Sequence, residues 1–67
     1  MYFVLTHGWG TDPNKHLTTE YYHYKDAKKA FNTIFDMYEK MFENGTGPDI
    51  TFTCILKQRG IESNGLN

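Results

Sequence analysis

The stretch from Ala27 to Phe42 constrains the fold most, because its hydrophobic residues recur with helical spacing. At 100° per residue, the apolar side chains fall in one arc about 160° wide. These side chains are Ala27, Ala30, Phe31, Ile34, Phe35, Met37, Tyr38, Met41 and Phe42. The opposite arc is polar and charged, so the pattern predicts an amphipathic helix. Its apolar arc is expected to supply most of the core, with Ile34 among the buried residues.

Residues at both ends of this stretch predict where the helix begins and ends. Asp26 comes just before it, and an aspartate carboxylate can accept hydrogen bonds from the free backbone N–H groups of a first turn. Asn44 and Gly45 follow it, and glycine readily takes the left-handed conformation that terminates helices. We therefore expect Asp26 to cap the helix and Gly45 to end it.

Three segments outside the helix have the composition of strands. Tyr2 to Thr6 is a continuous run of strand-forming residues with little alternation, which favours a central strand. Leu17 to Tyr24 is dominated by threonine and tyrosine and predicts a second strand. Ile50 to Lys57 alternates apolar and other residues, which predicts a third strand. Residues 7–14 contain two glycines and Asp12-Pro13, so a turn without regular structure is expected there.

These elements predict a small two-layer α+β domain of β-β-α-β order. One amphipathic helix would cover one face of a three-stranded, largely antiparallel sheet, with strand order 2-1-3 favoured because the first strand is the most continuously apolar. A chain of 67 residues is long enough for one domain, which we place at residues 1–57. Residues 58–67 are polar and glycine-containing, and we expect a flexible tail.

One helix leaves the second face of such a sheet uncovered, and the sheet has two open edges. Alternate residues expected on the uncovered face are Tyr2, Val4, Tyr21, His23 and Ile55. Aromatic residues make up 16% of the chain, more than this small core is expected to need. Open edges and exposed apolar faces favour pairing with another chain, so a homodimer is expected.

Charge and cysteine content bear on the compartment and on the partners. The formal net charge is -1, which favours neither nucleic acid nor a membrane surface. Cys54 is the only cysteine, so no disulfide can form within the chain, and a reducing compartment is favoured. No signal sequence or long apolar segment stands out, so we expect a cytoplasmic protein without membrane contact.

No pattern in the sequence indicates catalysis, a metal or a cofactor. His7, His16 and His23 lack the close ligand pair that is typical of zinc sites. Cys54 lies on the apolar side of its strand, where a thiol is usually a small buried hydrophobe rather than a nucleophile. The glycines around Trp9 match no phosphate-binding pattern. The expectation is a protein that is not an enzyme.

The function predicted from these features is that of a small binding module acting by protein–protein contact. It could serve as an inhibitor or adaptor of a larger host protein, and a phage or another mobile element is a natural setting. The expected partners are a second copy and an unidentified protein. Trp9 either packs on the core or stands exposed as a contact. The candidate binding residues are Trp9, Tyr2, Tyr21, His23 and Ile55.

The alternative is a nucleotide-binding or nucleic-acid-binding protein. Three lysines, at positions 25, 28 and 29, lie beside tyrosines at 21, 22 and 24. Basic residues next to rings that can stack on bases are typical of single-strand binders. The nearby Glu20 and Asp26 dilute the positive charge, which makes this the second hypothesis.

Overall fold

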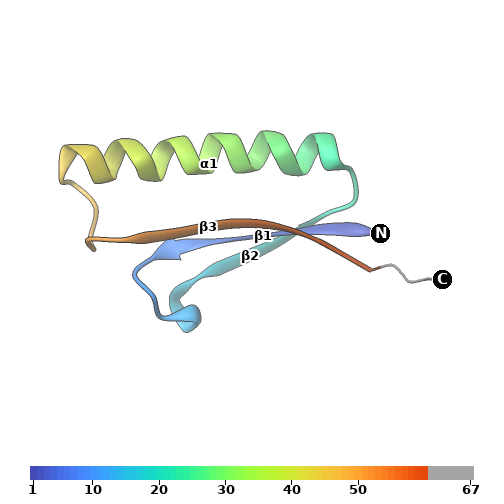
Figure 1. Ribbon diagram of the computed structural model, residues 1–67, viewed down its shortest axis with the longest axis horizontal. Helices are drawn as coiled ribbons and strands as arrows, with labels where there is room; N and C mark the ends of the chain where they lie inside the picture. Colours follow the sequence, from blue (N-terminus) through green and yellow to red (C-terminus); the bar gives the residue numbers. More distant parts are fainter. Residues whose placement is uncertain (61–67) are drawn as a thin grey trace.

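The computed structural model describes residues 1–60, which form two layers, a sheet and one helix lying along it (Figure 1). The elements are β1 (Tyr2–Trp9), a short 3₁₀ helix η1 (Pro13–Lys15), β2 (Leu17–Tyr21), α1 (Tyr24–Asn44) and β3 (Phe52–Arg59). The three-stranded sheet has the order β2-β1-β3, and β1 is antiparallel to both neighbours. The predicted β-β-α-β arrangement and strand order are therefore confirmed.

Strand β1 extends further than its composition indicates, because Gly8 accommodates a neighbour that any larger residue would exclude. The ring of His16 lies against Gly8, where a Cβ atom would collide with it. His16 also bonds the carbonyl oxygen of Gly10 through Nε2, at 3.1 Å. The connecting loop with η1 bends to the side of the sheet away from α1 (Figure 1). The prediction that no regular structure forms over residues 7–14 is wrong for the last three residues of β1 and for Pro13 and Asn14, which belong to η1.

Helix α1 begins earlier than predicted and ends where predicted. His23 occupies the N-cap position without a side-chain hydrogen bond, so the prediction that Asp26 caps the helix is wrong. Asp26 lies instead in the first turn, where its charge interacts favourably with the helix dipole. The predicted stop is confirmed, because Gly45 adopts φ 68° and its backbone N–H donates to the carbonyls of Met41 and Phe42.

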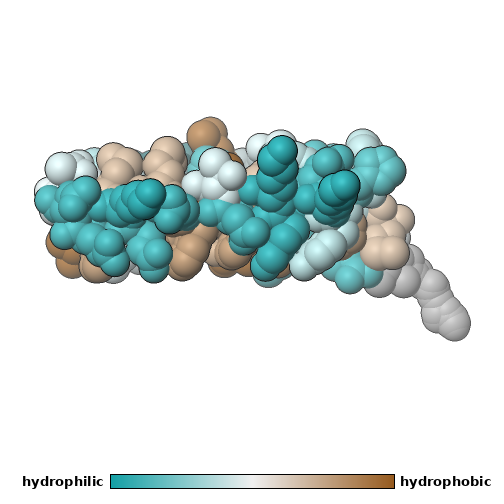
Figure 2. Space-filling model, turned by 90° about the horizontal axis from the view of Figure 1, so that it is seen from above, coloured by the Kyte–Doolittle hydropathy of each residue, from teal (hydrophilic) through white to brown (hydrophobic). Residues whose placement is uncertain are grey.

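Seen from above, the outer surface of the molecule is largely hydrophilic (Figure 2).

The core lies between α1 and the middle of the sheet. Leu5, Ala27 and Tyr38 are its buried hydrophobic residues, and Ile34 is only half-buried. The register with β3 places Leu56 opposite Leu5 on the helix-facing side. The core is therefore centred on β1 as much as on the helix.

Strand β3 confirms the predicted alternation with shifted ends. It begins and ends two residues later than predicted, at Phe52 and Arg59, and Ile50 precedes it with 81% of its surface exposed. Gln58 and Arg59, expected in the flexible tail, belong to β3. The rest of that predicted tail from residue 61 onward lies outside the described residues.

Glycine is required at position 47 for a different reason than at position 45. A Cβ atom on Gly47 would collide with the ring of Trp9. Gly45 has open space around it, so a side chain there would be unfavourable only because of its left-handed φ. We expect Gly47→Ala to cost about 2 kcal/mol through overpacking, and Gly45→Ala about 1 kcal/mol through backbone strain. Urea denaturation of both variants measures the difference, and a larger loss for Gly45→Ala would contradict the contact with Trp9.

Candidate functional site

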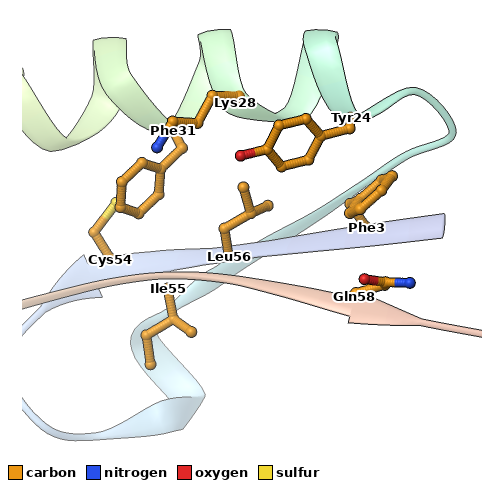
Figure 3. A pocket seen from close by; sticks show the side chains of 8 residues that line it. All are labelled: Phe3, Tyr24, Lys28, Phe31, Cys54, Ile55, Leu56 and Gln58. Atoms are coloured by element: carbon orange, nitrogen blue, oxygen red, sulfur yellow. The ribbon is translucent and has the colours of Figure 1, made fainter.

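One concave feature of the described residues is an open pocket of about 730 Å³ between α1 and β3 (Figure 3). It lies on the side of the sheet where α1 packs on β3, since the helix contacts β1 and β3 more than β2. We call it the edge groove. Its lining residues are Phe3, Tyr24, Lys28, Phe31, Cys54, Ile55, Leu56 and Gln58.

Strand alternation and helix position together aim side chains into the edge groove. Cys54 and Leu56 point towards α1, while Ile55 between them points to the other side of the sheet (Figure 3). From the helix, Lys28 brings its Nζ to 5.4 Å from the centre of the Phe31 ring. The groove therefore has an apolar floor and a cationic group at its helical rim.

Aromatic rings continue along the same flank of the helix beyond the edge groove. Phe31 and Phe35 stack with their centres 5.7 Å apart, and Phe35 and Phe42 each contact Phe52 of β3, at 5.6 and 6.2 Å. We call these four residues the aromatic row. Phe35 is 37% exposed and Phe42 51%, so the row is only partly covered. Figure 2 shows hydrophobic residues along both long edges of the molecule, with hydrophilic residues between them.

Behind the groove lies a small cluster of polar groups within the core. The Tyr38 hydroxyl and His7 Nδ1 form a hydrogen bond of 2.9 Å, and Cys54 lies opposite His7 in the register of β1 and β3. Burial raises the pKa of the Cys54 thiol. The pKa of Tyr38 is raised by burial and, to a smaller extent, by the negative charge that the nearby Cys54 carries when ionised. A raised thiol pKa keeps the sulfur protonated at neutral pH, which is the reverse of what a nucleophile needs.

These shifts predict a loss of stability at alkaline pH. A raised pKa means that the folded state binds the proton more tightly than the unfolded chain. The stabilisation is fully present below the ordinary values, 9.0 for cysteine and 10.0 for tyrosine, and is lost as the pH rises through the folded-state values. We expect the melting temperature to fall between about pH 8 and pH 11. Cys54→Ala should show a shallower fall, and a flat profile in the unmodified chain would contradict the burial of both groups.

The predicted binding residues do not gather in one place. The register puts Tyr2 opposite Arg59, and Ile55 opposite Thr6, on the sheet face away from α1. Val4 shares that face, opposite Lys57. Ile55 is 44% exposed and Tyr2 is half-buried.

The other three predicted residues lie elsewhere. Tyr21 pairs with Phe3 on the helix-facing side, so its predicted place on the uncovered face is wrong, because its strand begins at Leu17 in register with His7. His23 is the exposed residue before the helix, outside the sheet, so its predicted place on that face is also wrong. Trp9 is half-buried, with its ring 5.1 Å from that of Tyr38.

The uncovered sheet face is more polar than expected. Besides Tyr2, Val4 and Ile55, the register places on it Thr6, Thr18, Glu20, Thr53, Lys57 and Arg59. An alternation of threonine and charged residues can face water, so this face does not require a covering partner. Partly covered apolar side chains lie instead along the edge groove and the aromatic row, and also at Leu17 of β2 and Met37 of α1.

The aromatic row was not predicted from the sequence as a site. Its signal is nevertheless present in the helical arc, because Phe31, Phe35 and Phe42 lie on one flank and the aliphatic Ile34 and Met41 on the other. An asymmetric arc of this kind indicates that the aromatic flank has a different neighbour from the aliphatic one.

The fold and the groove define a small two-layer α+β domain with a partly apolar open edge. Among residues 1–60, no group of three or more His, Cys, Asp or Glu residues could hold a metal ion. The one helix described is too polar to cross a membrane. Comparison with known families, characterised proteins and solved structures finds no match to this chain.

Proposed function

We propose that this chain is a small non-enzymatic module that acts by protein–protein contact. The observation that carries the proposal is the edge groove with the aromatic row beside it, next to the outer edge of β3. Aromatic residues are enriched in protein interfaces, because large rings contribute much contact area at a small entropic cost. An open strand edge adds backbone groups that an extended segment of a partner can pair with.

In this role the chain would serve as an inhibitor or adaptor of a larger protein in the cytoplasm. It would act by occupying a surface rather than by chemistry. The protonated Cys54 supports this proposal, because the groove then offers no activated nucleophile.

The test is capture from a lysate of the source organism with the immobilised chain, using two variants that introduce the same residue. Phe35→Glu places a charge in the aromatic row, and Thr33→Glu places one on the exposed outer arc of α1. We expect one protein to be retained by the unmodified chain and by Thr33→Glu, and lost with Phe35→Glu. Circular dichroism is the control that checks whether both variants fold. Equal retention by both variants, or capture of nucleic acid alone, would contradict the proposal.

Nucleic-acid binding stays a second candidate because of the exposed tyrosines at the start of α1. Tyr22 is 74% exposed and Tyr24 55%, and the lysines at 25, 28 and 29 are also exposed. If this region binds single strands, affinity for an oligonucleotide should fall steeply with salt and weaken further in Tyr22→Ala. Titration of a fluorescent oligonucleotide at two salt concentrations measures both effects, and affinity independent of salt would exclude this candidate.

A further inference from the structure

The outer edge of β3 presents its backbone groups in a known pattern. The Gly10 N–H donates to the Thr51 carbonyl at 2.9 Å, so Thr51 and every second residue after it face β1. The N–H and C=O groups of Phe52, Cys54, Leu56 and Gln58 therefore point outward, and within the described residues no strand pairs with them. At the other edge, β2 has five residues and offers only Thr18 and Glu20. The edge of β3 is the longer template for pairing.

We propose that a second copy of this chain pairs its own β3 with this edge, antiparallel, with the twofold axis at Cys54. This inference rests on the proposed function, because it uses the same edge groove, and a second copy seated there would compete with the larger protein for it. The two sheets would form one continuous sheet with both helices on the same face. Cys54 would face Cys54 of the second copy, and Phe52 would face its Leu56. Since these side chains are on the helix-facing side, the incoming strand would place them against the edge groove.

The position of α1 fits this arrangement. The helix packs mainly on β1 and β3, and neighbouring strands lie about 4.8 Å apart. A helix centred between these strands is about 5 Å from a twofold axis at the edge of β3, so the two helices would be about 10 Å apart. That spacing is close to the 8–10 Å typical of packed helices. The aromatic rows would then meet between the helices.

Charge complementarity selects the register. The helix runs antiparallel to β3, since Tyr24 and Gln58 line the same pocket and Phe42 contacts Phe52. Counted from Tyr24 and Gln58, rises of about 1.5 Å per helical residue and 3.3 Å per strand residue place Cys54 beneath the middle of α1, near Thr33.

An axis at this point pairs opposite charges in both layers. Lys28 precedes Thr33 by about as many residues as Glu39 follows it, so Lys28 would lie opposite Glu39 of the second copy. At the end of β3, Arg59 would lie near Asp49 of the second copy, which precedes that copy's β3. Parallel pairing would set Lys57 against Lys57, and an axis at Ile55 would move Lys28 opposite an apolar residue instead. Antiparallel pairing about Cys54 therefore brings opposite charges together in both the helix layer and the sheet layer.

Light scattering and charge reversal test the proposal. We expect the chain at micromolar concentration to have about twice its 7.8 kDa mass. Lys28→Glu and Glu39→Lys should each weaken dimerisation about tenfold, because one substitution inverts two symmetric pairs. The double variant should recover the original affinity, and Lys29→Glu, on the outer arc, should change little. A monomer that persists to near-millimolar concentration, or a double variant without recovery, would overturn the proposal.

Cys54 gives an independent readout on the unmodified chain. Directly opposed residues in a hydrogen-bonded antiparallel pair have Cα atoms about 5.5 Å apart, within reach of a disulfide. Mild oxidation should therefore yield a covalent dimer that reduction reverses, and Cys54→Ser should remain a dimer without the covalent link. A dimer that cannot be linked at Cys54, even by a short thiol-specific cross-linker, would overturn this register. The lysate capture described above separates the two proposals. If the unmodified chain is a monomer, and it captures a protein that Phe35→Glu does not capture, the dimer alone is overturned.

Discussion

Leu5→Ala is expected to unfold most of the chain at room temperature. Leu5 is fully buried at 0% exposure, in the middle of the central strand, and its side chain faces the helix beside Leu56. Removing such a side chain typically costs about 2–5 kcal/mol, because the surroundings cannot close the cavity that it leaves. A domain of this size has only about 3–5 kcal/mol of stability in total. Urea denaturation at a fixed chain concentration measures the loss.

Leu17→Ala is the matched control. It removes the same atoms from β2, at a position that is 65% exposed, and should cost less than about 1 kcal/mol. If the two variants lose similar stability, the core is not centred on Leu5.

Phe52→Ala is expected to cost about 3–5 kcal/mol, the second large effect. The Phe52 ring contacts four others, and stacks with Tyr38 at 5.3 Å between ring centres, nearly parallel at 8°. It therefore connects β3 to the helix and to the end of β1. Its loss would release the first part of β3, so the thermal transition should also broaden.

Phe42→Ala is the matched control, because it removes the same phenyl ring from a more exposed position. Phe42 is 51% exposed, and within residues 1–60 its ring pairs with that of Phe52 alone. We expect it to cost about 1 kcal/mol. A scanning calorimetry trace with equal shifts for both variants would show that Phe52 is not the link between the layers.

Much of the fold follows from residue patterns that depend only on local geometry. The helical arc, the alternation in β3 and the continuous apolar run of β1 each correspond to a physical requirement, and together they led to the correct strand order. The errors lie where a distant neighbour decides. Gly8 stays in β1 because His16 packs on it, and the helix starts at Tyr24 although the strongest capping residue is Asp26. Neither the packing of His16 on Gly8 nor the start of the helix at Tyr24 can be read from the adjacent sequence.

The candidate site was less predictable than the fold. The groove residues Phe31, Cys54 and Leu56 were predicted to be on apolar faces, and the structure places all three on the helix–sheet interface. The sequence could not show that the helix packs off-centre, over β1 and β3. That offset leaves the aromatic row partly uncovered, whereas the predicted apolar sheet face is largely threonine and charge. A helical pattern defines which side is buried but not the strand above which it lies.

The strand order also has a consequence for synthesis on the ribosome. The central strand β1 comes first in the chain and its neighbour β3 comes last, so that Tyr2 pairs with Arg59. At about 5–20 residues per second, translation separates the end of β1 from the start of β3 by roughly 2 to 9 s. During that interval β1 and β2 can form a hairpin and α1 can form. One edge of β1 stays unpaired, and the Leu5 side chain stays partly exposed to water. The nascent chain must therefore remain soluble before β3 is made, because unpaired strand edges and exposed apolar side chains favour aggregation.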